Sequence, residues 1–287
     1  MKRILSFLLL GILVLSVIEA VAESNQTNLS LQETTFLDDD APEWNVGDTW
    51  IYTIDNVVVD YNKSGQKIFM NGTIDDLRWK VTDTSGDYYT LAVSGKLTAF
   101  YDIVLSSQTK TFHLVGEFKP SLTRFTGTIQ LTKSDLELHD LSIQIRGITR
   151  TKINSLPFAI PIPFKLVGDG QLSVDVPLFD FPLYELKFWN LPDLTITMSS
   201  VFGGIFGVIQ IPFTVSVHYS WTPFAFFCLE KKDVTVEAGT YSAYKIQSLI
   251  GDYFEYYYAP AAGNIIKVDA VLPNGEVHGE LKSTNYQ

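Results

Sequence analysis

Apolar and polar residues alternate with a period of two through much of the chain after Trp44. A period of two places successive side chains on opposite faces of an extended backbone, so each such run predicts a β-strand with one buried and one solvated face. The clearest runs cover residues 112–118, 125–132 and 213–221. No long stretch has the spacing of an amphipathic helix, and three glycines weaken the one short helix that can be considered, over residues 201–209.

Strands that follow one another without intervening helices favour antiparallel pairing. We therefore expect a mainly β fold, with an antiparallel sheet curved into a half-barrel, an open barrel or a sandwich, and with few or no long helices. The apolar phase slips near residues 139–140, which predicts a β-bulge or a break between two strands there. Turn residues at 85–87 and 274–275 predict hairpin connections. We find no internal repeat and no boundary within residues 44–287, which are expected to form a single β domain.

The N-terminal 22 residues have the three parts of a secretory signal peptide. Lys2 and Arg3 give a positive start, an apolar run continues to Ile18, and residues 20–22 supply a small-residue cleavage site. We expect cleavage there, because the apolar run is shorter than the roughly 20 residues that a membrane-spanning helix needs. Residues 23–43 are polar and acidic and are predicted to be a flexible lead-in. The mature protein is therefore expected to be secreted or extracytoplasmic.

The chain carries a net charge of −11 and a single cysteine, Cys228. An acidic surface repels nucleic acid and anionic membranes, so no nucleic-acid partner is expected. One cysteine cannot form an intrachain disulfide, and Cys228 is expected to be a small buried hydrophobe. Four N-x-Ser/Thr sequons are candidate sites of N-glycosylation in a host that glycosylates exported proteins. They begin at Asn25, Asn28, Asn62 and Asn71.

No sequence motif for catalysis or metal binding stands out. The chain has neither the Gly-x-Ser-x-Gly of serine hydrolases nor the His-Glu-x-x-His of zinc proteases. Its four histidines, at positions 113, 139, 218 and 278, are scattered singly. Glu255 lies in a tyrosine-rich run that fits either a sugar-stacking surface or ordinary cross-strand packing, and we favour the packing. We therefore assign no catalytic residue, no metal ligand and no cofactor, and we expect a protein that is not an enzyme.

Residues 156–227 carry an excess of large apolar side chains on a backbone interrupted by prolines. Prolines confine much of this segment to sheet edges and loops, which normally lie at the surface. Soluble monomers rarely expose a large contiguous apolar patch, so the segment is predicted to line a cavity or groove for an apolar ligand, with a well-filled core as the alternative. The candidate ligand-binding residues are Phe158, Phe164, Phe179, Phe181, Trp189, Phe202, Phe206 and Trp221.

Three segments of the chain resemble a known type of protein. Residues 44–52 (WNVGDTWIY), 234–246 (VTVEAGTYSAYKI) and 256–269 (YYYAPAAGNIIKVD) resemble uncharacterised secreted prokaryotic β proteins. Those proteins are similar in turn to the LolA/LolB-type lipoprotein carriers. The resemblance implies a half-barrel sheet around an apolar cavity, and it carries over no catalytic residue.

The favoured function is that of a secreted or cell-envelope protein that binds an apolar, lipid-like ligand in the cavity of a curved sheet. Peripheral contact with the cell envelope is a further expected interaction, and the oligomeric state is left open. One alternative is a structural or adhesive cell-surface protein, which the acidity and the sequons support. The second alternative is an extracellular glycan or lipid hydrolase, which only secretion and the tyrosine clusters support. A cavity favours the first function, a filled core the second, and a cleft with paired carboxylates or a Ser–His pair the third.

Overall fold

The computed structural model describes residues 40–63, 66–106, 111–154, 157–190, 194–204, 209–219, 225–248, 253–272 and 275–287. The expected signal peptide, the lead-in up to residue 39 and the sequons at Asn25 and Asn28 lie outside these residues. Strands make up 75% of the structure, and no α-helix occurs among the described residues. These residues contain no helix long and apolar enough to cross a membrane.

The described residues form fifteen strands and one 3-10 turn, and the strands pair in an antiparallel manner throughout. In chain order they are β1 (Thr49–Lys63), β2 (Gln66–Asp83), β3 (Tyr88–Ser106), β4 (Thr111–Phe118), β5 (Thr123–Thr132), β6 (Leu138–Ile153), β7 (Ile160–Val176), β8 (Phe188–Asn190), β9 (Leu194–Gly204), β10 (Ile209–Tyr219), β11 (Ala225–Val236), β12 (Gly239–Ser248), β13 (Tyr253–Ala259), η2 (Pro260–Ala262), β14 (Asn264–Leu272) and β15 (Gly275–Thr284).

All the strands belong to one large sheet, in the order β10-β9-β7-β6-β4-β3-β2-β1-β15-β14-β13-β12-β11-β8. β5 pairs with both β3 and β6, so the pairings of β3, β4, β6 and β5 form a closed ring. Gly95 of β3 lies opposite Phe125 of β5, and Ala99 lies opposite Phe118 of β4. β4 and β5 therefore lie end to end between β3 and β6. This antiparallel, helix-poor architecture confirms the expected fold class.

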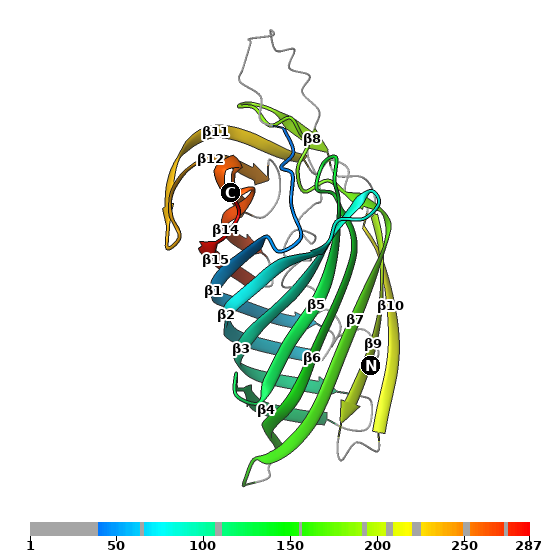
Figure 1. Cartoon of the computed structure of the whole chain (residues 1–287). Coiled ribbons are helices and arrows are strands. Elements are labelled where there is room, and N and C mark those ends of the chain that lie inside the picture. Colours follow the sequence, from blue (N-terminus) through cyan, green and yellow to red (C-terminus); the bar gives the residue numbers. More distant parts are fainter. Residues whose placement is uncertain are drawn as a thin grey trace.

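The long strands bend along a line that crosses the sheet. The register of β1 shifts between Ile54 and Asn56, and that of β2 shifts between Asp75 and Arg78. The same line passes through the break between β4 and β5, at residues 119–122. Bulges bend a strand and increase its twist. Figure 1 shows the result, because β1, β2 and β3 turn at one edge and continue behind β5, β6 and β7.

Gly147 of β6 permits the closest approach of two strands at this bend. It lies opposite Thr123, the first residue of β5. A Cβ atom at position 147 would lie far inside the van der Waals contact distance from the backbone carbonyl oxygen of Leu122. That oxygen accepts a hydrogen bond from the amide of Ile148 at 3.1 Å, so it is fixed in place. Only glycine fits between the two backbones here.

We expect Gly147→Ala to lower the free energy of unfolding by about 2 kcal/mol, because the added methyl group forces β5 away from β6. Thermal unfolding followed by circular dichroism measures this as a fall of several degrees in Tm. Thr126→Ala, at an exposed position of β5, is the control and is expected to change Tm by less than about 2 degrees. Equal Tm values for the two variants would show that the bend tolerates a side chain.

The structure confirms the expected phase slip and the hairpins. Gln130 pairs with Asp140 and Leu131 pairs with Leu138, so His139 is the extra residue of a bulge in β6. The turn at 85–87 joins β2 to β3. The second predicted hairpin joins β14 to β15, where Leu272 pairs with Gly275; Gly275 is therefore the first residue of a strand rather than a turn residue, and Asn274 lies outside the described residues.

The short helix considered over residues 201–209 is wrong wherever the structure describes those residues. Residues 201–204 are the end of β9, and Ile209 is the first residue of β10 and pairs with Gly204. β9 also pairs with β7 on its other side. Pairing on both sides satisfies the backbone hydrogen bonds that a glycine-rich helix of this length would form only weakly.

One hydrophobic core runs from the bent part of the sheet to the C-terminal strands. Two buried tryptophans near the start of β1 tie it to the turn η2. The indole Nε1 of Trp44 donates to the carbonyl oxygen of Gly263 at 2.8 Å, and that of Trp50 donates to the carbonyl oxygen of Ala262 at 2.6 Å. Two of the three segments that carry the family resemblance therefore lie against each other.

Candidate functional site

Three of the eight predicted ligand-binding residues lie together in an aromatic cluster against β11 and β13. The ring centroid of Phe179 is 5.4 Å from that of Phe181 and 5.0 Å from that of Tyr258. The ring of Trp189 is 5.8 Å from that of Phe226. Phe179 and Trp189 are only 3% and 6% exposed. Close ring contacts of this kind are typical of a filled core. A well-filled core is the alternative that the sequence left open to a ligand cavity.

The backbone around this cluster is held by specific hydrogen bonds. The amide of Leu186 donates to the carbonyl of Cys228, and the amide of Cys228 donates to the carbonyl of Lys187, each at 2.7 Å. The hydroxyl of Tyr256 donates to the carbonyl of Leu178. Cys228 is buried, as expected, and burial raises the pKa of its thiol to about 12. The thiol therefore stays protonated and unreactive at neutral pH.

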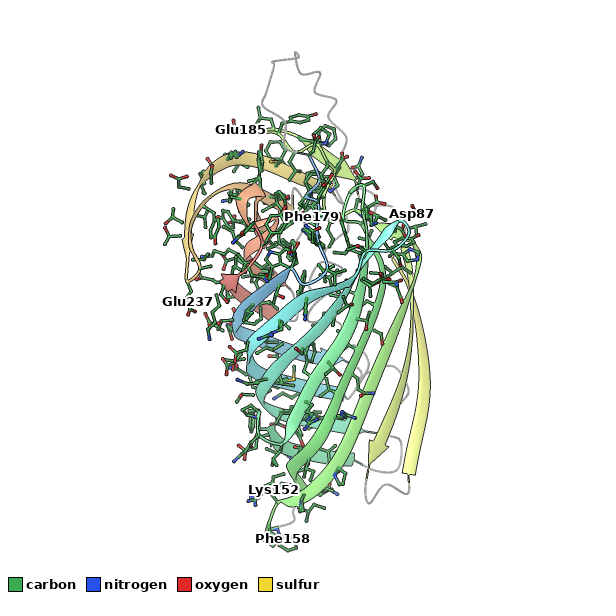
Figure 2. All side chains as sticks on the ribbon, viewed as in Figure 1. Asp87, Lys152, Phe158, Phe179, Glu185 and Glu237 are labelled. Carbon is green, nitrogen blue, oxygen red and sulfur yellow. The ribbon has the colours of Figure 1, made fainter. Side chains whose placement is uncertain are left out.

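The other five predicted residues lie on other segments of the chain. Phe158 is 59% exposed and lies at the opposite end of the molecule from Phe179 (Figure 2). The remaining four divide between paired strands and residues outside the described ranges. Phe164 lies on β7 and Phe202 on β9, whereas Phe206 and Trp221 lie outside the described residues.

Two polar atoms on the core-facing side of β1 and β2 have no hydrogen-bond partner among the described residues. They are the hydroxyl oxygen of Tyr52 and the indole Nε1 of Trp79. The two rings pack edge to face with centroids 5.5 Å apart. Buried polar groups in proteins nearly always have a partner, and an unmet one costs about 1–3 kcal/mol. This pair, the Tyr52–Trp79 site, is therefore the strongest candidate for contact with a bound molecule.

The surroundings of the Tyr52–Trp79 site are apolar. Tyr52 lies between Leu77 of β2 and Leu281 of β15, and Trp79 pairs with Val93 of β3. The three aliphatic residues are between 0% and 4% exposed. Burial raises the pKa of Tyr52 well above its ordinary value, so its phenol stays neutral.

The chemistry of the site follows from its donors. The indole N–H of Trp79 can only donate, and the hydroxyl of Tyr52 can donate or accept. A carbonyl, ester, ether or carboxyl oxygen on an otherwise apolar molecule matches this pair. Sequence reasoning missed both residues, although each falls on the core-facing parity of an alternating run. The alternating pattern predicts the face of the sheet on which a residue lies, but it does not predict whether the polar atom of that residue has a hydrogen-bond partner.

Glu255 lies on the opposite face of the C-terminal strands. Its carboxylate bonds to the Nζ of Lys245 at 2.7 Å and accepts a hydrogen bond from the hydroxyl of Tyr257. Glu255 is 3% exposed. Tyr256 and Tyr258 belong to the core on the other face. Because the run divides between two faces, it packs across strands and forms no continuous sugar-stacking surface.

Three histidines each bond to an aspartate on a neighbouring strand. His113 bonds to Asp102 at 2.8 Å and His139 bonds to Asp175 at 2.7 Å. His278 of β15 bonds in the same way to an aspartate of β14 at 2.8 Å. In the sequence these histidines are scattered singly, and their spacing does not indicate these partners. Within the described ranges no three potential metal ligands of the His, Cys, Asp or Glu type gather in one place.

Comparison of the chain with protein-family models, with curated proteins and with solved structures finds no match in any of the three.

Proposed function

We propose that this protein is a secreted or cell-envelope carrier or sensor, without enzymatic activity, that binds an apolar, lipid-like molecule inside the bent sheet. The observation that carries the proposal is the Tyr52–Trp79 site, where two buried polar atoms have no described partner. A bound molecule with an oxygen acceptor at this point would remove the cost of both unmet groups.

The interior around the site supports an apolar ligand. Small-molecule sites are mostly apolar, with a few polar groups that fix the orientation of the ligand. The aliphatic neighbours of Tyr52 and Trp79 supply the apolar wall, and the two polar atoms supply the orientation. A lipid-like molecule has a long apolar part, which matches the apolar wall, and a small polar head, which matches the two polar atoms.

The family resemblance supports the same function. The segments that carry it, residues 44–52 and 256–269, are joined through Trp50 and η2. Tyr52 itself ends the first of these segments. The carriers to which such proteins are similar hold their cargo in a half-barrel, and we propose that the bent sheet plays this part in the present chain.

A hydrolase is the weaker proposal. The most buried described carboxylate, that of Glu255, is already bonded to the ammonium of Lys245 and to the phenol of Tyr257. A catalytic carboxylate needs a face open to the substrate and a second group positioned opposite it. Glu255 is instead one member of a buried ion pair.

The test uses the purified mature protein, a fluorescent fatty-acid probe and Tyr52→Phe. We expect the probe to bind at micromolar concentration and to bind about fivefold to tenfold more weakly to Tyr52→Phe, because one hydrogen bond to the ligand is lost. The Tm of unliganded Tyr52→Phe should stay equal or rise, since the change removes an unmet hydroxyl rather than a contact.

Tyr88→Phe is the matched control, because Tyr88 stacks on His139 and is away from the core-facing side of β1. It should bind the probe as the unaltered protein does. Native mass spectrometry of protein from its own host should show a co-purifying lipid. Absence of probe binding, or equal binding by the two variants, contradicts the proposal.

A further inference from the structure

The turn between β6 and β7 exposes apolar side chains at one end of the molecule. Pro157, Phe158 and Ala159 are all exposed, and we call them the apolar tip. Phe158 is 59% exposed, and Figure 2 shows it at the far end of the long strands, beside Lys152. The ring of Phe158 contributes little to the core, and together with Pro157 and Ala159 it makes this end of the molecule apolar.

A strip of cations runs along the same hairpin. Arg146, Arg150 and Lys152 are exposed on β6 at positions of the same parity, with the exposed Ile148 between the first two, and thus share one face. Arg146 lies directly between Arg124 of β5 and Lys165 of β7 in the strand register. Like charges directly opposite one another destabilise a sheet. We call Arg124, Arg146, Arg150 and Lys152 the basic strip, and it holds three of the five arginines of the chain.

The carboxylates that the structure describes do not neutralise the basic strip. Among the side chains that the structure describes, no carboxylate forms an ion pair with any member of the strip. Glu117 lies opposite Arg150 in the register, but its carboxylate bonds to Lys119 at 2.9 Å. Unpaired cations gathered on one face of a protein with net charge −11 point to an anionic partner.

We propose that the β6–β7 hairpin docks the protein on an anionic lipid membrane, with the apolar tip in the interface and the basic strip against the lipid phosphates. Arg150 pairs with Pro161, three residues after Phe158, and Thr151 pairs with Ile160, so Arg150 and Lys152 lie within about 10 Å of Phe158 along the strands. Apolar side chains of peripheral proteins enter the headgroup region to a depth of about 5–10 Å. Arg150 and Lys152 therefore come level with the phosphates when Phe158 enters the membrane.

An acidic protein is the other partner that a basic strip can recognise, and the tip argues against it. Protein interfaces cover broad patches whose core is apolar and whose rim is polar. Here the apolar part is a narrow turn at the end of the molecule, with the cations behind it along the strands. This order, from the apolar tip to the basic strip, matches the order of the membrane layers from the interior outward, where the apolar region is followed by the anionic headgroups.

The experiment is sedimentation of the mature protein with two kinds of vesicle. One kind contains phosphatidylglycerol and phosphatidylcholine in equal amounts, and the other contains phosphatidylcholine alone. We expect binding to the anionic vesicles that weakens as salt is added. Arg150→Gln/Lys152→Gln should reduce binding by at least about tenfold, since each cation near an anionic surface strengthens binding about fivefold.

The matched control is Arg78→Gln/Lys80→Gln. Arg78 and Lys80 are also exposed at alternate positions of one strand, β2, and their removal changes the net charge by the same amount. This control should bind the anionic vesicles as the unaltered protein does. Equal losses in the two double variants would show that binding follows net charge alone and would overturn the proposal.

Phe158 is tested by two substitutions. Phe158→Ser should weaken vesicle binding about tenfold, because it removes the aromatic ring from the tip. In Phe158→Trp, the fluorescence of the introduced indole should be quenched by brominated lipid in anionic vesicles, which requires insertion of the tip. Absence of vesicle binding, or binding to polyglutamate but not to vesicles, contradicts the proposal. The inference is independent of the ligand site, because Tyr52→Phe should leave vesicle binding unchanged and the tip variants should leave binding of the soluble probe unchanged.

Discussion

Replacement of Lys245 by methionine is expected to lower the free energy of unfolding by about 3–5 kcal/mol, the usual cost of leaving a buried charge without its partner. The Nζ of Lys245 lies 2.7 Å from Glu255, and their side chains are 18% and 4% exposed. The variant keeps most of the apolar stem of the lysine and removes the terminal ammonium group. The carboxylate of Glu255 then keeps the phenol of Tyr257 but loses the ammonium that balances its charge.

Urea unfolding followed by circular dichroism measures this loss. Lys96→Met is the control, because Lys96 also bonds to a carboxylate, that of Asp76 at 2.6 Å, but with side chains that are 61% and 38% exposed. Solvent screens an exposed pair, so this control should lose about 1 kcal/mol or less. The double variant Lys245→Met/Glu255→Leu should recover much of the stability, since both charges of the buried pair are removed together. If the single and double variants are equally unstable, the loss comes from packing and not from charge.

The strands of this fold follow from the sequence, because local alternation determines them. The runs at 112–118 and 125–132 became β4 and β5, and the slip at His139 became a bulge. The bend of the whole sheet does not follow in the same way. The buried apolar residues of β2 change parity between Ile74 and Leu77, and this change is visible in the sequence. Only the pairing of β1 with β2 shows that it lies beside the register shift after Ile54.

The candidate sites depend on tertiary contacts that composition cannot supply. The apolar excess of residues 156–227 predicted one ligand-binding surface, and the described part of that segment divides between a packed cluster at Phe179 and an exposed tip at Phe158. The net charge of −11 predicted repulsion from anionic membranes. The net charge does not tell where the charged residues lie. The pairing of β5 with β6 places Arg124 beside Arg146, and this local concentration of positive charge is hidden in the net charge.

Replacement of Trp50 by alanine is expected to cost about 3–5 kcal/mol of unfolding free energy, because Trp50 is one of the largest fully buried side chains in the described core. Its ring packs 4.8 Å from that of Trp44 and 5.8 Å from that of Tyr286, so the truncation leaves a cavity where the two ends of the domain meet. The loss also leaves the carbonyl of Ala262 without its 2.6 Å hydrogen bond.

Trp50→Phe separates these two contributions. The phenyl ring fills most of the space but donates no hydrogen bond, so this variant should lose about 1–3 kcal/mol, the cost of the unmet carbonyl and the smaller ring. Phe100→Ala removes an aromatic ring that is 47% exposed and should cost less than about 1 kcal/mol. Urea unfolding ranks the three variants. Equal stability of Trp50→Ala and Phe100→Ala would show that the contact between β1 and η2 does not hold the domain together.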